Sequence, residues 1–295
     1  MVKYAVLAPV GAGVTSDPSW MTEFARHVEA CGFESIVVVD HPVVIADYTS
    51  RYPYDSSGRF GLAEDCPIPD PLELLSFIAA RTDALGLATG VLVLPLHQPV
   101  VLAKRVATLD RLSAGRVRLC IGVGWMREEA QACGVDFASR GRRADESIDV
   151  MRALWAQAGP EGASHKGEFF AFDRALSYPK PFAPSGVPIH IGGHSVAAAR
   201  RAGRRGDGFQ PLGLAKEDLA DRLAVMRAEA EAAGRDPARL EVTLGHFLGR
   251  ITQERAASLA ALGASRILLT PTETADLAEV KDEIFACAER LGLHA

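Results

Sequence analysis

The chain has 295 residues, a length that suits two average domains or one α/β barrel. Hydrophobic residues make up 48% and charged residues 23%, the balance of an ordinary globular protein that can bury a core. A net charge of −5 with no basic stripe argues against nucleic acid and anionic membrane surfaces as partners. The five cysteines are odd in number and form no C-x-x-C pair, which argues against a disulfide framework and a zinc knuckle.

The N-terminus enters an apolar run at once, without the full h-region and cleavage site of a signal peptide. No apolar run in the sequence reaches the length needed to span a membrane. We therefore expect a cytoplasmic protein with reduced thiols and no membrane partner.

The first predicted elements are a strand at 4–8 and a helix at 18–31. Asp17 marks the start of this helix as its N-cap, and Pro18 takes the first helical position. A continuous apolar run at 35–40 then predicts a strand that is buried on both faces of a parallel sheet.

A long irregular segment at 42–69, which we call the lid, follows this strand. Loops of this length in compact domains are usually functional or disordered. Its aromatic residues favour an ordered wall over disorder, and they are Tyr48, Tyr52, Tyr54 and Phe60. A second irregular stretch at 159–185 contains a small predicted hairpin around 168–172.

The rest of the chain continues the alternation of short apolar runs and amphipathic helices. The further predicted strands lie at 87–94, 116–121, 188–191, 207–210, 240–244 and 266–269. Between and after them we predict helices from Asp70, at 144–155, from about 196, at 253–262 and at 274–291. Two more helices are predicted from their apolar stripes, one formed by Leu102, Val106, Leu109 and Leu112 and the other by Leu219, Leu223, Met226 and Ala230. Strands and helices in this number predict an α/β fold, a (β/α)₈ TIM barrel spanning residues 1–295 as one domain. An open doubly wound sheet is the alternative, since alternation alone does not prove closure.

Functional residues of such a barrel lie where strands end and the following loops begin. The second strand ends in Asp40, His41 and Pro42, and the proline favours an extended His41 at the mouth. A neutral histidine there can act as a general acid or base near neutral pH. A structural histidine bonded to a backbone carbonyl is an equally good interpretation of the position alone.

Glycines lie within one further strand and at the end of another. Gly90 inside the third strand indicates either close approach by a ligand ring or a packing notch. Gly122 and Gly124 end the fourth strand and allow tight backbone approach to a ligand, although a plain turn would look the same. The acids after them, Glu128 and Glu129, are the residues that favour a helix start.

The fifth strand runs into Gly192, Gly193, His194 and Ser195, and a helix follows. Exposed N–H groups, a serine hydroxyl and a helix N-terminus together suit a phosphate. The alternative is an ordinary N-cap at Ser195 after a glycine turn. The histidines show neither H-x-H nor H-E-x-x-H spacing, so we expect no metal site, and no G-x-S-x-G motif offers a serine nucleophile.

Taken in order, several stretches resemble the bacterial luciferase-like family of flavin and deazaflavin oxidoreductases. They are VDHP at 39–42, ATGVLVLP at 88–95, AKRVATLDRLS at 103–113, GVGW at 122–125, RGRRADE at 140–146, and PIHIGGHS at 188–195 with AGRRGDG at 202–208. The resemblance covers nearly the whole chain, and the ordered set is specific although each piece alone is not.

The resemblance implies a cofactor ring in the barrel mouth, braced by a non-proline cis peptide at Gly90–Val91, with the phosphate on the turn before Ser195. His41 matches a position where some deazaflavin-dependent members use a histidine near the hydride-accepting carbon, so it is the catalytic candidate. The cofactor-binding residues that we expect are Asp40, His41, Thr89, Gly90, Val91, Gly122, Gly124, Gly192, Gly193, His194 and Ser195.

The pattern is most similar to members that use coenzyme F420, a deazaflavin that moves hydride, and so implies hydride transfer to or from a small organic substrate. Members that use flavin mononucleotide (FMN) share most of these motifs. A monooxygenase using reduced flavin and oxygen therefore remains an alternative, and a non-catalytic flavin-binding protein is another. The resemblance also implies a homodimer. It assigns no role to Glu128, because the acid that some sugar-phosphate dehydrogenases carry after the fourth strand is not clearly matched.

Overall fold

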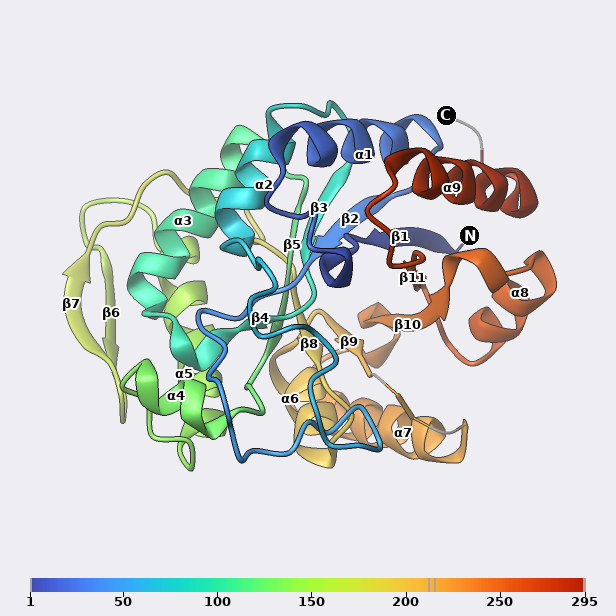
Figure 1. Cartoon of the computed structure of the whole chain (residues 1–295). Helices are drawn as coiled ribbons and strands as arrows, with labels where there is room; N and C mark the ends of the chain where they lie inside the picture. Colours follow the sequence, from blue (N-terminus) through green and yellow to red (C-terminus); the bar gives the residue numbers. More distant parts are fainter. Residues whose placement is uncertain (1, 212, 215, 294–295) are drawn as a thin grey trace.

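The computed structural model describes residues 2–211, 213–214 and 216–293. Within these residues a parallel sheet closes into a barrel, with helices packed around it (Figure 1). The barrel strands are β1 (Lys3–Leu7), β2 (Ser35–Val38), β3 (Gly86–Thr89) with β4 (Leu92–Val93), β5 (Val117–Gly122), β8 (Ile189–Gly192), β9 (Gly208–Gln210), β10 (Glu241–Phe247) and β11 (Arg266–Thr270).

Closure follows from the strand pairing. The sheet holds nine strands, and β3 pairs with β5 while β1 pairs with β11, so the order returns to its start. β3 and β4 follow one another along the same edge of β5, so they count as one strand of the barrel. The nine strands of the described residues therefore form an eight-stranded barrel. The predicted (β/α)₈ barrel is thus confirmed, and the open doubly wound sheet is excluded.

The helices lie outside the strands. They are α1 (Pro18–Ala30), α2 (Pro71–Ala79), α3 (Pro99–Leu112), α4 (Arg127–Ala132), α5 (Arg140–Ala156), α6 (Val196–Arg205), α7 (Lys216–Ala232), α8 (Gln253–Ala261) and α9 (Leu277–Leu291). α1, α2, α6 and α8 begin within one residue of the predicted starts, whereas α5 begins four residues before and α9 three residues after them. Asp17 caps α1 and Asp70 caps α2, each through a carboxylate that accepts two backbone N–H groups. In the described residues, no helix is long and apolar enough to cross a bilayer.

The prediction of one continuous strand at 87–94 is wrong. The strand breaks at Gly90–Val91, which is a cis peptide bond, and the chain turns into a short 3₁₀ helix at Leu94–Leu96. The cis peptide that the family resemblance implies is therefore present. The ladder to β5 is interrupted there, between the pair of Ala88 with Arg118 and the pair of Leu92 with Ile121, and both halves run parallel to β5.

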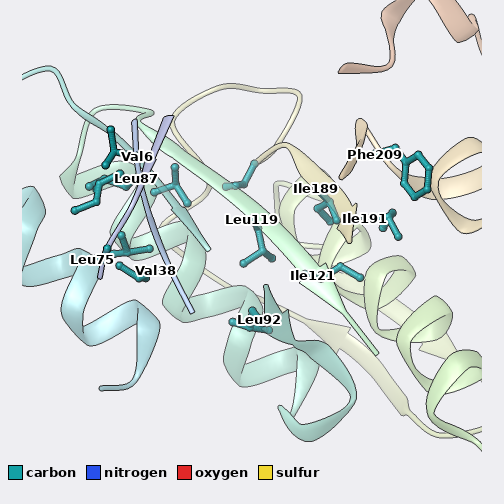
Figure 2. Close-up of a cluster of buried hydrophobic side chains, with 14 of the residues drawn as sticks. Val6, Val38, Leu75, Leu87, Leu92, Leu119, Ile121, Ile189, Ile191 and Phe209 are labelled. Atoms are coloured by element: carbon teal, nitrogen blue, oxygen red, sulfur yellow. The ribbon is translucent and has the colours of Figure 1, made fainter. Parts of the chain in front are cut away.

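Apolar side chains on the outer face of the barrel form the main core. Figure 2 shows Leu75 of α2 lying beside Val38 of β2 and Leu87 of β3. Leu119 of β5 and Ile189 of β8 lie farther along the same layer and, like Leu75 and Leu87, are fully buried. Burying one such side chain contributes about 1.5–3 kcal/mol, so this layer fixes the strands that carry the site.

The inside of the barrel is charged at its N-terminal end. Arg266, only 2% exposed, bridges Glu34 at 2.8 Å and Glu241 at 2.7 Å, and Arg118 lies 3.3 Å from Glu34. Burial alone would raise the pKa of Glu34, but the hydrogen bond from Arg266 and the two positive charges outweigh it and lower that pKa to about 2. Ion pairs therefore occupy the barrel interior at this end.

Two connections stand out from the barrel. The lid contains no helix or strand and runs in front of the barrel past α4 and α6 (Figure 1). The predicted hairpin is formed by β6 (Ala163–Lys166) and β7 (Ala171–Ala175), which pair antiparallel (Figure 1). It therefore begins a few residues before the predicted position.

Candidate active site

The strand break at the cis peptide Gly90–Val91, which we call the bulge, forms one wall of the barrel mouth. The Val91 side chain lies over Gly122 and Gly192, and a methyl group added at Gly122 would come within 2.7 Å of Val91 Cγ2. A methyl group at Gly90 or Gly192 would overlap Val37 or Val91 in the same way. The glycines at these strand ends thus make room for the bulge, which is the packing explanation left open by the sequence.

Two predicted cofactor-binding residues hold the bulge in place. The carboxylate of Asp40 accepts the backbone N–H of Val93 at 2.9 Å and lies 2.8 Å from His97 Nε2. The hydroxyl of Thr89 donates to the carbonyl of Cys120 at 2.6 Å. Both polar groups already form hydrogen bonds within the protein. They would therefore affect a cofactor indirectly, by fixing the position of the Gly90–Val91 peptide.

His41 lies at the end of β2 with its ring against the start of α4. Its Nδ1 atom is 3.0 and 3.1 Å from the two carboxylate oxygens of Glu129, and the side chains are only 8% and 1% exposed. A carboxylate accepts hydrogen bonds, so Nδ1 carries a proton, and in the neutral ring Nε2 has the free lone pair. This is the arrangement of a general base that a buried acid orients.

Glu129 is a member of this site that sequence reasoning missed. The sequence indicates only an ordinary helix start for Glu128 and Glu129, and α4 does begin at Arg127. The signal that could have identified it is its position in the segment that follows β5, at the same end of the barrel as His41. Its partner lies 88 residues earlier, so no local pattern shows the pairing.

Glu128 points to the lid and anchors it. Its carboxylate accepts the backbone N–H groups of Thr49 at 2.8 Å and Ser50 at 3.1 Å, and both hydroxyls at 2.7 and 2.6 Å. The hydroxyl of Ser50 in turn accepts the N–H of Arg127 at 2.9 Å. The hydrogen bond from Ser50, supported by that from Thr49, lowers the pKa of Glu128 to about 2, so the anchor stays ionised at neutral pH.

The aromatic residues of the lid pack around Trp125, as the prediction of an ordered wall requires. The rings of Tyr48, Tyr52 and Phe60 lie 5.3, 5.1 and 5.7 Å from the Trp125 ring, between their centroids. Phe60 is also 5.0 Å from the His41 ring. The indole nitrogen of Trp125 is buried without a hydrogen-bond partner, which is the condition of a group that a ligand could satisfy.

The turn before α6 matches the predicted phosphate cradle in part. Ser195 is the N-cap, as the alternative interpretation held, because its Oγ accepts the N–H of Ala198 at 3.1 Å. The N–H of Gly193 is already used by the carbonyl of Gln210 at 3.2 Å. An anion at this position would therefore bind the first N–H groups of α6, which have no partner within the helix.

His194 completes the turn and faces the lid. Its ring lies edge-on to that of Tyr54, with the centroids 5.0 Å apart. Its Nδ1 atom is buried without a hydrogen-bond partner, like the indole nitrogen of Trp125. The last predicted position, Gly124, has a positive φ of 80°, as a tight turn after β5 requires.

These features together fit a cofactor with a planar ring and a phosphate. The bulge would supply a surface for the ring, the aromatic wall would cover it, the first turn of α6 would bind an anion, and two buried polar atoms lack partners. In the described residues, no group of three or more His, Cys, Asp or Glu side chains is placed to hold a metal. The fold and site therefore define a barrel enzyme of the kind that binds an organic cofactor at the C-terminal ends of its strands.

The chain belongs to the luciferase-like monooxygenase family, whose model matches residues 2–284. An uncharacterised protein of Mycobacterium tuberculosis is 33% identical over 233 residues, which cover 78% of each chain. An F420-dependent glucose-6-phosphate dehydrogenase of Nakamurella multipartita is 31% identical over 223 residues, which cover 74% of this chain and 60% of that protein.

Solved structures with the same fold come from enzymes with different cofactors. The monooxygenase RslO1 of Streptomyces bottropensis has a TM-score of 0.79 at 18% identity, with 98% of each chain covered. An F420-dependent secondary alcohol dehydrogenase, solved with an F420–acetone adduct, has a TM-score of 0.78 at 18% identity, with 100% of this chain and 99% of that one covered. At these identities the two structures support the fold alone.

Proposed function

We propose that this protein is an oxidoreductase that transfers a hydride between coenzyme F420 and a small organic substrate at the barrel mouth. The observation that carries the proposal is the His41–Glu129 pair, because a hydride leaving an alcohol carbon requires a base for the hydroxyl proton. The F420-dependent name of a relative that is 31% identical supports the choice of cofactor.

The residues named above would hold the cofactor and move the proton. F420, when bound, supplies the hydride chemistry. The Gly90–Val91 bulge would support its ring, and the turn of Gly193, His194 and Ser195 with the start of α6 would hold its phosphate. Nε2 of His41 would take the substrate hydroxyl proton in oxidation or return it in reduction.

The surrounding residues prepare this proton transfer. Glu129 would stabilise the imidazolium that forms when His41 accepts the proton, since its carboxylate already holds Nδ1. The lid would exclude water, because its aromatic residues pack over His41 and Trp125. A planar or apolar substrate suits such a wall.

A monooxygenase that uses reduced FMN and oxygen is the second candidate. The family whose model matches residues 2–284 is described as luciferase-like monooxygenases, which favours it, and the two solved structures, at 18% identity, do not distinguish it from the first. A flavin-binding protein without catalysis is the third candidate, and it predicts tight binding with no transfer to any substrate.

Fluorescence titration of the purified protein with oxidised F420, beside one with FMN, tests the proposal. Saturable binding of F420 alone, followed by reduction of F420 with a member of an alcohol panel, is the expected result. Preference for FMN and consumption of oxygen with reduced FMN would replace the proposal by the second candidate. Tight binding without transfer to alcohols or activated alkenes would favour the third.

A further inference from the structure

Gln210 connects the two parts of the mouth that would hold a cofactor. It is the last residue of β9, pairs with Gly192 of β8 and is only 5% exposed. Its carbonyl accepts the N–H of Gly193 in the turn before α6. Its side chain crosses the barrel interior, so that Nε2 lies 3.9 Å from the point where a Cβ on Gly90 would stand.

Cys120 fixes which way the amide of Gln210 faces. The Cys120 thiol donates to Gln210 Oε1 at 3.4 Å, and both side chains are buried. Complete burial raises the pKa of Cys120 to about 12, although Arg118 and Arg266 oppose the shift, so the thiol keeps its proton. A protonated thiol can donate only to the amide oxygen, which turns the NH₂ group toward Gly90.

We infer that Gln210 is a cofactor-positioning residue, whose amide N–H donates to an acceptor atom of the ring bound at Gly90–Val91. This inference rests on the proposed function, since it requires a flavin or deazaflavin ring at the bulge. Such rings carry carbonyl oxygens and ring nitrogens that accept hydrogen bonds. A neutral amide can orient the ring without adding a charge to the site, and a hydrogen bond to the ring would offset the free-energy cost of burying the amide N–H.

The test measures the dissociation constants of F420 and FMN for the whole chain and for Gln210→Leu, by fluorescence titration and by the absorption spectrum of the bound ring. We expect binding of the preferred cofactor to weaken about five- to tenfold, as the loss of one neutral hydrogen bond predicts. The shift of the absorption band on binding should become smaller as well. Gln210→Met repeats the test with a flexible side chain of similar length, in case the leucine variant folds poorly.

Thr243→Val is the matched control. Thr243 lies on the neighbouring strand β10, and its buried hydroxyl lacks a hydrogen-bond partner, so its removal takes a polar group from the same barrel without touching the bulge. The dissociation constant of the preferred cofactor for Thr243→Val should stay within twofold of the wild-type value. Cys120→Ala should weaken binding by about two- to threefold, because Gln210 remains but its amide is no longer oriented.

The outcomes separate this inference from the proposed function. If the wild type binds a cofactor and both Gln210 variants, shown to be folded by circular dichroism, bind it equally well with an unchanged spectrum, Gln210 has no such role and the proposed function stands. If the wild type binds neither F420 nor FMN, the proposed function fails and this inference fails with it. Weaker binding by Thr243→Val equal to that by Gln210→Leu would also overturn the inference.

Discussion

Glu128 and Glu129 are adjacent in the chain and hold different parts of the site. Glu129 binds His41 through Nδ1 at 3.0 Å, and Glu128 binds the lid through four hydrogen bonds from Thr49 and Ser50. Because both acids stand in the first turn of α4, that helix couples the position of the proposed base to the position of the lid. The two carboxylates can be removed separately, which allows the two roles to be distinguished.

Glu129→Gln should slow hydride transfer and leave cofactor binding nearly unchanged. The amide can still accept the Nδ1 proton of His41, but it does not stabilise the imidazolium. We expect kcat to fall about 10- to 100-fold, which is part of the 10²–10⁴ that an acid–base residue contributes. Turnover is followed by the absorbance of F420 with an alcohol that the panel identifies.

His41→Ala, measured in the same assay, should give the lowest turnover of these variants, because it removes the proposed base. Turnover should fall by about 10²–10⁴, and the affinity for the cofactor should fall by much less. In His41→Ala, the pH profile of kcat should no longer show the ionisation of the base. In Glu129→Gln, that ionisation should appear at a different pH than in the wild type. An unchanged rate in His41→Ala would remove His41 from the mechanism, and an unchanged pH profile in Glu129→Gln would reduce Glu129 to a packing residue.

Glu128→Ala should free the lid without affecting the His41–Glu129 pair. Four hydrogen-bond donors of Thr49 and Ser50 lose their acceptor, so the backbone of this part of the lid should open more often. Hydrogen exchange measured by mass spectrometry should show faster exchange in peptides covering 45–60. Exchange in α5 is the internal control, and faster exchange there to the same extent would indicate general destabilisation instead.

The sequence predicted what local patterns determine. The strand–helix alternation, the caps at Asp17 and Asp70 and the N-cap at Ser195 all depend on neighbouring residues, and the structure confirms them. The break of the third strand at Gly90 required the family resemblance, since no propensity rule predicts it. The contacts of His41 with Glu129 and of Cys120 with Gln210 arise only when the barrel closes and brings distant strands together.

Glu34→Gln should destabilise the fold through the charged end of the barrel. It leaves the buried guanidinium groups of Arg266 and Arg118 without their shared counter-charge. Breaking a buried ion pair by removing one partner costs about 3–5 kcal/mol in the free energy of unfolding. Urea unfolding measures the change, and Lys3→Ala is the control, because its exposed pair with Glu241 should contribute less than about 1 kcal/mol.

His190 should make the fold less stable as the pH falls. Burial, and then the charges of Arg118 and Arg266, lower its pKa from 6.5 to about 3. Between these values the unfolded chain binds a proton that the folded chain does not, so stability is lost as the pH falls from about 6.5 toward 3. His190 should contribute up to about 1.4 kcal/mol per pH unit to the change of the unfolding free energy with pH in that window.

The variant His190→Gln should flatten the pH dependence of the unfolding free energy between pH 6 and pH 4.5. Glu34 and Glu241, whose pKa values are lowered to about 2, lose their contribution only below about pH 4.5, so they do not obscure the comparison in that range. Urea unfolding at several pH values gives the two slopes. Equal slopes for wild type and variant would mean that His190 is protonated in the folded protein, with Glu241 at 3.6 Å as its counter-charge.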